Sequence, residues 1–487
     1  MTLARFQSRS SAAVPRAAGP AVHVVTFGCQ MNKYDSLLAE GRFRRNGYRV
    51  TEAIGEADVV LFNTCSVREH AEERALSWLG ELRREKERRP DLVIGVMGCY
   101  AQRAEEEVFR RAPHVDLVCG TRRFQHLPEL VAEVRSRRAD PAARRRADLR
   151  VLDTGLDDRV AVDRAGEPYT GGLHGYLAVM RGCDLNCTYC IVPRTRGRVQ
   201  SRPIADLVAE ARWMVEQGCR VVTLLGQTVN SYGEDLPAPG PGGPRGSGRR
   251  GRPSLADLVY ALQELEGLTR IRFVTLHPAY LTVALAEALR DCPKADRFLP
   301  LPAQSGSDAV LRAMRRGYTT ELYRRRVDLL RERVPDVELG SDWIVGFPGE
   351  SEADFSASEA FLEEIGFAQS YVFKYDPRPE TAAHERPDDV PLEVKKERNR
   401  RLLACAERVG LVRMRAQLGR EQSVLVEEVS DREPGVLRGR TRHNLPIRFE
   451  GGPELVGGEA RVVVREASPY GLAGERLLDD PHTDGAG

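Results

Sequence analysis

Residues 176–190 read YLAVMRGCDLNCTYC, an apolar run followed at once by three closely spaced cysteines, Cys183, Cys187 and Cys190. A short apolar run with β-branched and aromatic residues predicts a buried strand, with the cysteines on the loop at its carboxyl end. Iron–sulfur clusters are held by thiolates, usually four of them. Three thiolates on one loop predict a cluster with one iron open to a small ligand, as a catalytic metal site requires. A zinc knuckle or a structural cluster is the alternative, although zinc favours paired CxxC spacings.

Five more strand-like runs follow this one, separated by helical patterns, and a last helix is predicted over 392–416. The runs are VVTLL from Val221, IRFVTL from Ile271, RFLPL from Arg297, LGSDWIV from Leu339 and SYVFKY from Ser370. Strands that alternate with helices predict a parallel sheet. Six such units predict an open, partial (β/α)6 barrel rather than a complete eight-fold one. The Gly-, Pro- and Arg-rich insertion that starts at Leu236 is predicted to be a flexible surface loop.

A separate α/β domain with a parallel sheet is predicted over 21–136, from the strand-like runs HVVTF, DVVLFN, LVIGVM and VDLV. Cys29, Cys65 and Cys99 each follow one of the first three runs. Because the carboxyl ends of parallel strands meet at one edge of a sheet, these thiols are expected to converge. Buried cysteines that lie in register by coincidence are the alternative. The pattern therefore predicts a second metal site, with Cys119 as a rival fourth ligand, whereas Cys219, Cys292 and Cys405 are interpreted as core residues.

The remaining segments are interpreted as a disordered tail (1–20), a linker (137–168) and a small β-barrel (417–480). The tail is rich in Arg and Ser, and a targeting segment is the other interpretation. In the barrel, SVLVEEV, VLRGRTR, LPIRFEG and ARVVVREA are short alternating strands. A basic stretch runs through it, and Phe449 is the aromatic residue beside it; the basic residues are Arg438, Arg440, Arg442, His443 and Arg448. Such a stretch fits a single-stranded RNA surface or a solvated strand face.

Composition limits the remaining possibilities. The chain has 487 residues, ten cysteines and a net charge of +2, with 41% hydrophobic and 30% charged residues. That length predicts two to four domains. No run of about 18 apolar residues occurs, so the sequence predicts no membrane span. The cysteines are too sparse for a disulfide scaffold, which favours a reducing, cytoplasmic setting where clustered thiols bind metal.

Five stretches resemble the methylthiotransferase family of radical S-adenosylmethionine enzymes. They are GCQMNKYDS from Gly28, FNTCSVRE from Phe62, GCDLNCTYCIVPRTRGRVQSRP from Gly182, LLGQTVNSY from Leu224 and SDWIVGFPGE from Ser341. The resemblance extends from Ala21 to about Leu478. It is strongest to the members that modify an adenosine next to the anticodon of tRNA. It implies an amino-terminal methylthiotransferase domain, a radical core over 169–416 and a terminal TRAM domain.

The resemblance also implies the cofactors. Cys183, Cys187 and Cys190 would hold a [4Fe–4S] cluster that cleaves S-adenosylmethionine to a 5′-deoxyadenosyl radical, and Cys29, Cys65 and Cys99 an auxiliary [4Fe–4S] cluster that delivers sulfur. The candidate S-adenosylmethionine contacts are Tyr189, Gly226, Gln227 and Gly346. Tyr189 has simple core packing as an equal alternative. No further catalytic residue is implied.

The expected reaction converts N6-dimethylallyladenosine beside the anticodon to its 2-methylthio derivative. The expected partners are the tRNA anticodon loop and an electron donor such as flavodoxin or ferredoxin, with no membrane, for a chain that acts as a monomer. Three alternatives stay open. They are a relative that modifies an aspartate of a ribosomal protein, a tRNA enzyme specific for threonylcarbamoyladenosine, and a non-catalytic RNA-binding electron carrier.

Overall fold

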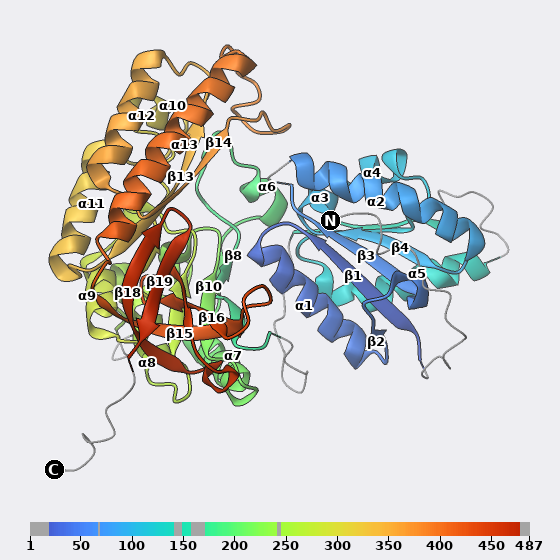
Figure 1. Cartoon of the computed structure of the whole chain (residues 1–487). Helices are drawn as coiled ribbons and strands as arrows, with labels where there is room; N and C mark the ends of the chain where they lie inside the picture. The colour runs from blue at the N-terminus through green and yellow to red at the C-terminus, as the bar shows by residue number, and fades with distance from the viewer. Residues whose placement is uncertain (1–18, 67–68, 141–148, 157–170, 241–244, 478–487) are drawn as a thin grey trace. The chain divides into compact units, whose positions relative to one another are not determined.

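The computed structural model describes residues 19–66, 69–140, 149–156, 171–240 and 245–477. It divides into two compact units (Figure 1). The first comprises residues 1–168 with the segments 181–184 and 191–200, and the second comprises the remainder. The predicted tail and the Pro-rich part of the insertion at 241–244 fall largely outside the described residues. No helix among the described residues is both long and apolar enough to cross a membrane.

The first unit is built on a six-stranded parallel sheet of order β2-β1-β3-β4-β5-β6. Its strands are β1 (Ala21–Phe27), β2 (Arg49–Val50), β3 (Val59–Thr64), β4 (Val93–Met97), β5 (Leu117–Cys119) and β6 (Val151–Asp153). Its helices are α1 (Gln30–Arg45), α2 (Glu69–Arg88), α3 (Cys99–Ala104), α4 (Glu106–Arg111), α5 (Leu127–Ala139) and α6 (Val192–Arg196). The predicted parallel α/β domain is confirmed.

Helices cover both faces of this sheet (Figure 1). The strands are apolar at almost every position, as expected when both faces are buried. Phe43 of α1 and Leu130 of α5 pack on one face, and Leu79 of α2 and Phe109 of α4 on the other. Because the strands are all parallel, their carboxyl ends lie at one edge of the sheet.

Two short stretches of the predicted linker over 137–168, residues 137–139 and 151–153, belong to regular elements of the first unit. Helix α5 continues to Ala139, and β6 pairs in parallel with β5 through Leu117↔Val151. A three-residue edge strand, VLD, between charged segments is too short to show a period of its own, and only pairing with β5 makes it a strand. Residues 141–148 and 157–168 of that segment lie outside the described residues.

The second unit contains six parallel strands in two half-sheets, β7-β10-β11 and β12-β13-β14, joined by the bridge Ile271↔Ala295. The strands are β7 (His174–Ala178), β10 (Val221–Leu225), β11 (Arg270–Phe273), β12 (Phe298–Pro300), β13 (Glu338–Val345) and β14 (Gln369–Lys374). The helices are α7 (Ile204–Glu216), α8 (Leu255–Gln263), α9 (Val283–Asp291), α10 (Asp308–Ala313), α11 (Thr320–Arg333), α12 (Glu352–Ile365) and α13 (Leu392–Arg415). The predicted partial barrel is confirmed. Two short strands, β8 (Met180–Arg181) and β9 (Gln200–Ser201), pair at the ends of the segment that carries Cys183.

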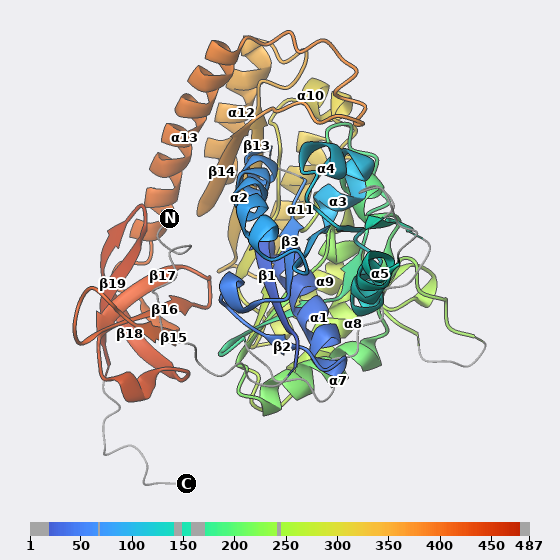
Figure 2. The same ribbon diagram turned by 90° about the vertical axis from the view of Figure 1, so that its right-hand side faces the viewer.

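Helix α13 leads into a closed five-stranded barrel of order β15-β16-β17-β19-β18 (Figure 2). Its strands are β15 (Glu421–Val429), β16 (Val436–Thr441), β17 (Pro446–Glu450), β18 (Glu459–Ser468) and β19 (Gly471–Arg476). The first four match the predicted runs. The fifth, GLAGER, carries two glycines and two charges, so it shows no strand pattern in sequence. The barrel packs on the α/β part of its unit, where Arg272 bridges Asp296 and Glu427 at 3.0 Å each.

Candidate functional site

The thiols of Cys29, Cys65 and Cys99 follow three adjacent strands of the first unit. Cys29 precedes α1 after β1, Cys65 comes directly after β3, and Cys99 begins α3 after β4. Cys65 is tied to the neighbouring strand by its amide, which donates to the Phe27 carbonyl at 2.8 Å. Cys29 is exposed, whereas Cys65 and Cys99 are buried. The fold thus brings to one sheet edge three thiols that are some 35 residues apart in sequence.

Glycines let the backbone approach closely at this edge. A Cβ on Gly28 would lie 2.6 Å from the Cβ of Cys65, and one on Gly98 would lie 2.3 Å from Oδ1 of Asn63. Gly98 has φ +92°, in the region that favours glycine. Any side chain at either position would push the thiol-bearing turns apart.

A buried amide network fixes two of these turns. The side-chain amide of Asn32 donates to Oδ1 of Asn63 at 2.9 Å, and the Asn63 amide donates to the Asn32 carbonyl at 2.8 Å and to Ser36 Oγ at 2.9 Å. The Cys29 thiol donates to Asn32 Oδ1 at 3.2 Å. Both asparagines are fully buried. The sequence reasoning missed these residues, although both lie in the motifs around Cys29 and Cys65.

The electrostatics of the edge favour the thiolate form of Cys29. A hydrogen bond with Cys65 lowers the pKa of Cys29 to about 5, and the positive charge of Arg196 lowers it too, although partial desolvation of the sulfur opposes them. Burial raises the pKa of Cys99, and Arg196 opposes that rise. Thiolate is the form that binds metals. The rival ligand Cys119 is fully buried at the end of β5, and burial raises the pKa of its thiol well above the ordinary value.

The three thiols form a soft donor set that fits an iron–sulfur cluster better than a single ion. Among the described residues, no three His, Cys, Asp or Glu side chains lie close enough to hold one metal ion. In a [4Fe–4S] cluster each thiolate binds its own iron, so the sulfurs stand wider apart than around one ion. The tight glycine turns and the positive charge beside the thiols also fit a bulky anionic group.

The predicted radical cluster ligands lie on the segment after β8. The Cys183 amide donates to the Gly197 carbonyl at 3.1 Å within the first unit. Cys187 and Cys190 share a tight turn in the second unit, closed by the Cys190 amide and the Cys187 carbonyl at 3.1 Å. Nη1 of the buried Arg316 donates to the Cys187 sulfur at 3.3 Å. A charged donor to this sulfur fits a thiolate ligand, since charge-assisted hydrogen bonds favour the ionised partner.

Of the four candidate S-adenosylmethionine contacts, one has a buried polar atom without a partner among the described residues, and packing accounts for the other three. The carbonyl oxygen of the Gln227 side chain is buried and accepts no hydrogen bond from the described residues, which fits a ligand-facing acceptor. Tyr189 packs against the apolar cluster of Met314, Phe347 and Tyr375. A Cβ on Gly226 would lie 2.7 Å from Met180 Cγ, and one on Gly346 would lie 2.3 Å from Lys395 Cγ, so packing alone requires both glycines.

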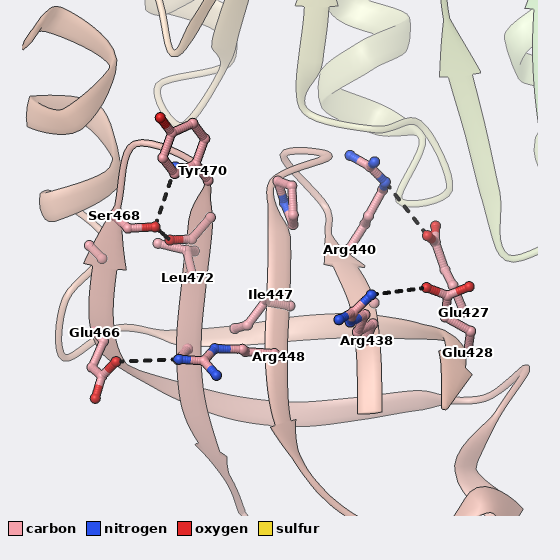
Figure 3. A pocket seen from close by; sticks show the side chains of 15 residues that line it. Glu427, Glu428, Arg438, Arg440, Ile447, Arg448, Glu466, Ser468, Tyr470 and Leu472 are labelled. Atoms are coloured by element: carbon pink, nitrogen blue, oxygen red, sulfur yellow. Dashed lines mark hydrogen bonds and ion pairs between the residues drawn. The ribbon is translucent and has the colours of Figure 1, made fainter. Parts of the chain in front are cut away.

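One face of the terminal barrel carries arginines around a pocket of about 450 Å³ (Figure 3). Arg438 and Arg448 are cross-strand neighbours on β16 and β17, each about half exposed. Arg440 lies on the same face, and the acidic partners are Glu427, Glu428, Glu433 and Glu466. Arg442 and His443 lie elsewhere, because Arg442 donates to the Pro293 carbonyl and His443 contacts Asp336 at 3.4 Å.

The aromatic residue of this face is Tyr470, not Phe449. Side chains alternate along a strand, so Phe449 turns into the barrel core next to the outward Arg448, and it is only 3% exposed. Tyr470, in the turn between β18 and β19, is 85% exposed and lines the arginine pocket (Figure 3). The expectation that Phe449 is the aromatic beside the arginines is therefore wrong. Tyr470 is brought there by the pairing of β17 with β19.

Comparisons with known proteins cover the whole architecture. Residues 21–120 match the uncharacterized protein family UPF0004, residues 177–362 the radical SAM superfamily, and residues 415–477 the TRAM domain. The tRNA-2-methylthio-N(6)-dimethylallyladenosine synthase of Alkalilimnicola ehrlichii is 41% identical over 94% of this chain and 98% of its own length. That of Stutzerimonas stutzeri is 39% identical over 93% and 98%.

Solved structures agree on the fold alone. The radical S-adenosylmethionine methyltransferase TsrM of Kitasatospora setae, with tryptophan and a S-adenosylmethionine analogue bound, has a TM-score of 0.51 at 16% identity, covering 75% of each chain. Its form with cobalamin and a [4Fe–4S] cluster also has a TM-score of 0.51, at 15% identity, over 90% of this chain and 82% of that one.

Proposed function

This chain belongs to the radical S-adenosylmethionine methylthiotransferases called tRNA-2-methylthio-N(6)-dimethylallyladenosine synthases, and from that premise we propose how its residues divide the work. The chain is a tRNA methylthiotransferase that uses S-adenosylmethionine and [4Fe–4S] clusters. The observation that carries our proposal is the convergence of three thiols at the carboxyl edge of a parallel sheet, in a unit separate from the turn of Cys187 and Cys190.

Cys29, Cys65 and Cys99 would hold the auxiliary cluster, and Cys183, Cys187 and Cys190 the radical cluster. When bound, the clusters and S-adenosylmethionine supply the one-electron chemistry and the sulfur needed to replace an unactivated aromatic C–H bond. The chain's own residues position these groups. Asn32 and Asn63 fix the turns of Cys29 and Cys65, and Arg316 donates to the Cys187 sulfur.

Gln227 is the candidate S-adenosylmethionine contact with most support, because its buried acceptor lacks a partner among the described residues. Tyr189, Gly226 and Gly346 stay candidates. We further propose a flavodoxin- or ferredoxin-type electron donor, since no redox carrier other than the clusters is implied, and a monomeric chain in the reducing cytoplasm, where iron-binding thiols stay reduced.

The decisive test is mass spectrometry of tRNA nucleosides from cells with and without the gene. Loss of 2-methylthio-N6-dimethylallyladenosine, with its unthiolated precursor accumulating, is the expected result. Loss of the methylthio form of threonylcarbamoyladenosine would instead favour the alternative tRNA enzyme that is specific for that nucleoside. An unchanged tRNA profile with a lighter ribosomal protein would favour the aspartate-modifying activity. Purified protein that cannot cleave S-adenosylmethionine under dithionite would favour a non-catalytic carrier.

The arginine face of the barrel is the proposed contact for the tRNA. Arginines supply charge for phosphates, and an exposed tyrosine supplies a stacking surface for an unpaired base. The acidic partners of Arg438, Arg440 and Arg448 compete for the same guanidinium groups, so RNA must displace exposed ion pairs that stabilise little.

Tyr470→Ala is expected to weaken tRNA binding roughly tenfold, because base–aromatic stacking contributes about 1–3 kcal/mol per base. The measurement is a filter-binding or anisotropy titration of the full chain with an anticodon stem-loop. Tyr260→Ala, which removes an exposed tyrosine of helix α8, is the matched control and should bind as the parent does. Equal affinities for the parent and the Tyr470 variant would remove this face from the tRNA site.

A further inference from the structure

Arg196 is held rigidly at the thiol edge of the first unit. It ends helix α6, is only 4% exposed, and α6 packs on α3, whose first residue is Cys99. Its backbone carbonyl accepts hydrogen bonds from Nε and Nη2 of the Arg122 guanidinium, at 3.1 and 2.9 Å. The preceding carbonyl, of Thr195, accepts from Thr121 Oγ1 at 2.5 Å. These hydrogen bonds fix the position of the backbone from which the Arg196 side chain extends.

The charges around Arg196 do not balance. Nη2 of Arg196 lies 3.0 Å from Asp35 Oδ2, but the same carboxylate also pairs with Arg181 at 2.6 Å. All three side chains are buried, so two positive charges share one negative charge. Removing charges from water is costly unless they are compensated, and a surplus buried cation requires a nearby anion.

The guanidinium also has unused donors. Nη1 makes no hydrogen bond to the described residues, and Nη2 has only its ion pair with Asp35. Burial alone would lower the pKa of Arg196, but Cys99, Asp35 and Cys29 raise it above its ordinary value. Arg196 pairs with Asp35 of α1, the helix that follows Cys29, and α6 packs on α3, the helix that begins at Cys99, so the guanidinium lies beside the thiol edge. Buried donors without a partner point to a group that binds there.

We infer that Arg196 is a positioning residue that supplies the counter-charge for the auxiliary cluster, with Asp35 holding the guanidinium in place. This inference rests on the proposed ligands Cys29, Cys65 and Cys99. The negative charges of three thiolates exceed the positive charge of the oxidised cluster core. The loaded site is therefore an anion, and it becomes more negative when it gains an electron. A fixed positive charge stabilises the reduced form more than the oxidised one, and net charge and hydrogen bonding set cluster potentials.

The consequence is specific to one cluster. Removing the charge of Arg196 should lower the midpoint potential of the auxiliary cluster, making it harder to reduce. Lysine in the same place keeps a positive charge and should retain most of the parent potential. The radical cluster should keep its midpoint potential, because its cationic donor is a different residue, Arg316, which donates to the Cys187 sulfur.

The test is an EPR-monitored redox titration of the full chain in which Cys183, Cys187 and Cys190 are alanine, so that only the auxiliary cluster gives a signal. Arg196→Met, Arg196→Lys and Arg103→Met are compared in that background. Arg103 is the matched control, because it lies on α3 beside Cys99 but pairs with Glu72 at 2.6 Å and with Ser66. Iron and sulfide contents report loading independently of the potential.

The expected result is a lower potential for Arg196→Met and potentials near the parent for Arg196→Lys and Arg103→Met. Two results would overturn the role of Arg196. One is an Arg196→Met variant that binds the cluster and has the parent potential. The other is loss of the cluster in both the Arg196→Met and the Arg196→Lys variants, which would show that Arg196 acts through packing and not through its charge. A parent chain that binds no cluster would overturn the proposed ligands, and with them this role.

Discussion

Changing Cys29, Cys65 and Cys99 together to alanine is expected to abolish methylthio insertion while reductive cleavage of S-adenosylmethionine continues. The trio lies in the first unit, on a different part of the chain from the Cys187–Cys190 turn. Removing it should therefore take away the sulfur-bearing cluster without touching the other. Iron content should fall from about eight to about four per chain, since each cluster holds four irons.

Two controls make this result specific. Cys119→Ala removes a fully buried thiol at the end of strand β5 in the same sheet, and this variant should keep the full iron content. Changing Cys183, Cys187 and Cys190 to alanine should give the opposite pattern, with no cleavage of S-adenosylmethionine but with the auxiliary cluster retained. The measurements are iron analysis after anaerobic reconstitution, deoxyadenosine release under dithionite, and nucleoside mass spectrometry. Retention of two clusters after loss of the first trio would contradict the assignment.

Asp35→Asn is expected to destabilise the first unit by about 3–5 kcal/mol, the cost of breaking a buried ion pair by removing one partner. The carboxylate is fully buried and pairs with Arg181 and Arg196, so its loss leaves two buried cations without their shared anion. Asparagine keeps the shape, which separates charge from packing. Hydrogen–deuterium exchange of β3 and β4 peptides in the metal-free chain measures the change in opening free energy.

The comparison variant is Glu87→Gln, which removes one partner of an exposed pair with Arg83 on α2 of the same unit. Exposed pairs contribute about 0–1 kcal/mol, so exchange in β3 and β4 should hardly change. If Asp35→Asn altered protection no more than Glu87→Gln does, the buried cluster of charges would not stabilise the unit as described.

Local sequence pattern was enough to predict most of the strands and to group Cys29, Cys65 and Cys99 at one sheet edge. An apolar run of five or six residues predicts a strand that is buried on both faces, and the residue after it must lie at the strand's carboxyl end. That is why Cys29, Cys65 and Cys99 could be grouped before their positions were known. The strands that were missed are β2, β6, β9 and β19. They are short or rich in Gly and charge, and they exist only because a neighbour supplies hydrogen bonds.

The sequence by itself determined the fold class and the six cysteines of the proposed cluster sites, since the identity and order of the cysteines and the alternation of strands and helices are local properties of the chain. Only the tertiary structure decided what surrounds those cysteines. Arg196 comes 97 residues after Cys99 along the chain, and Tyr470 comes 22 residues after Arg448. Contacts at such separations depend on how the elements pack and pair, and no periodicity in the sequence records them.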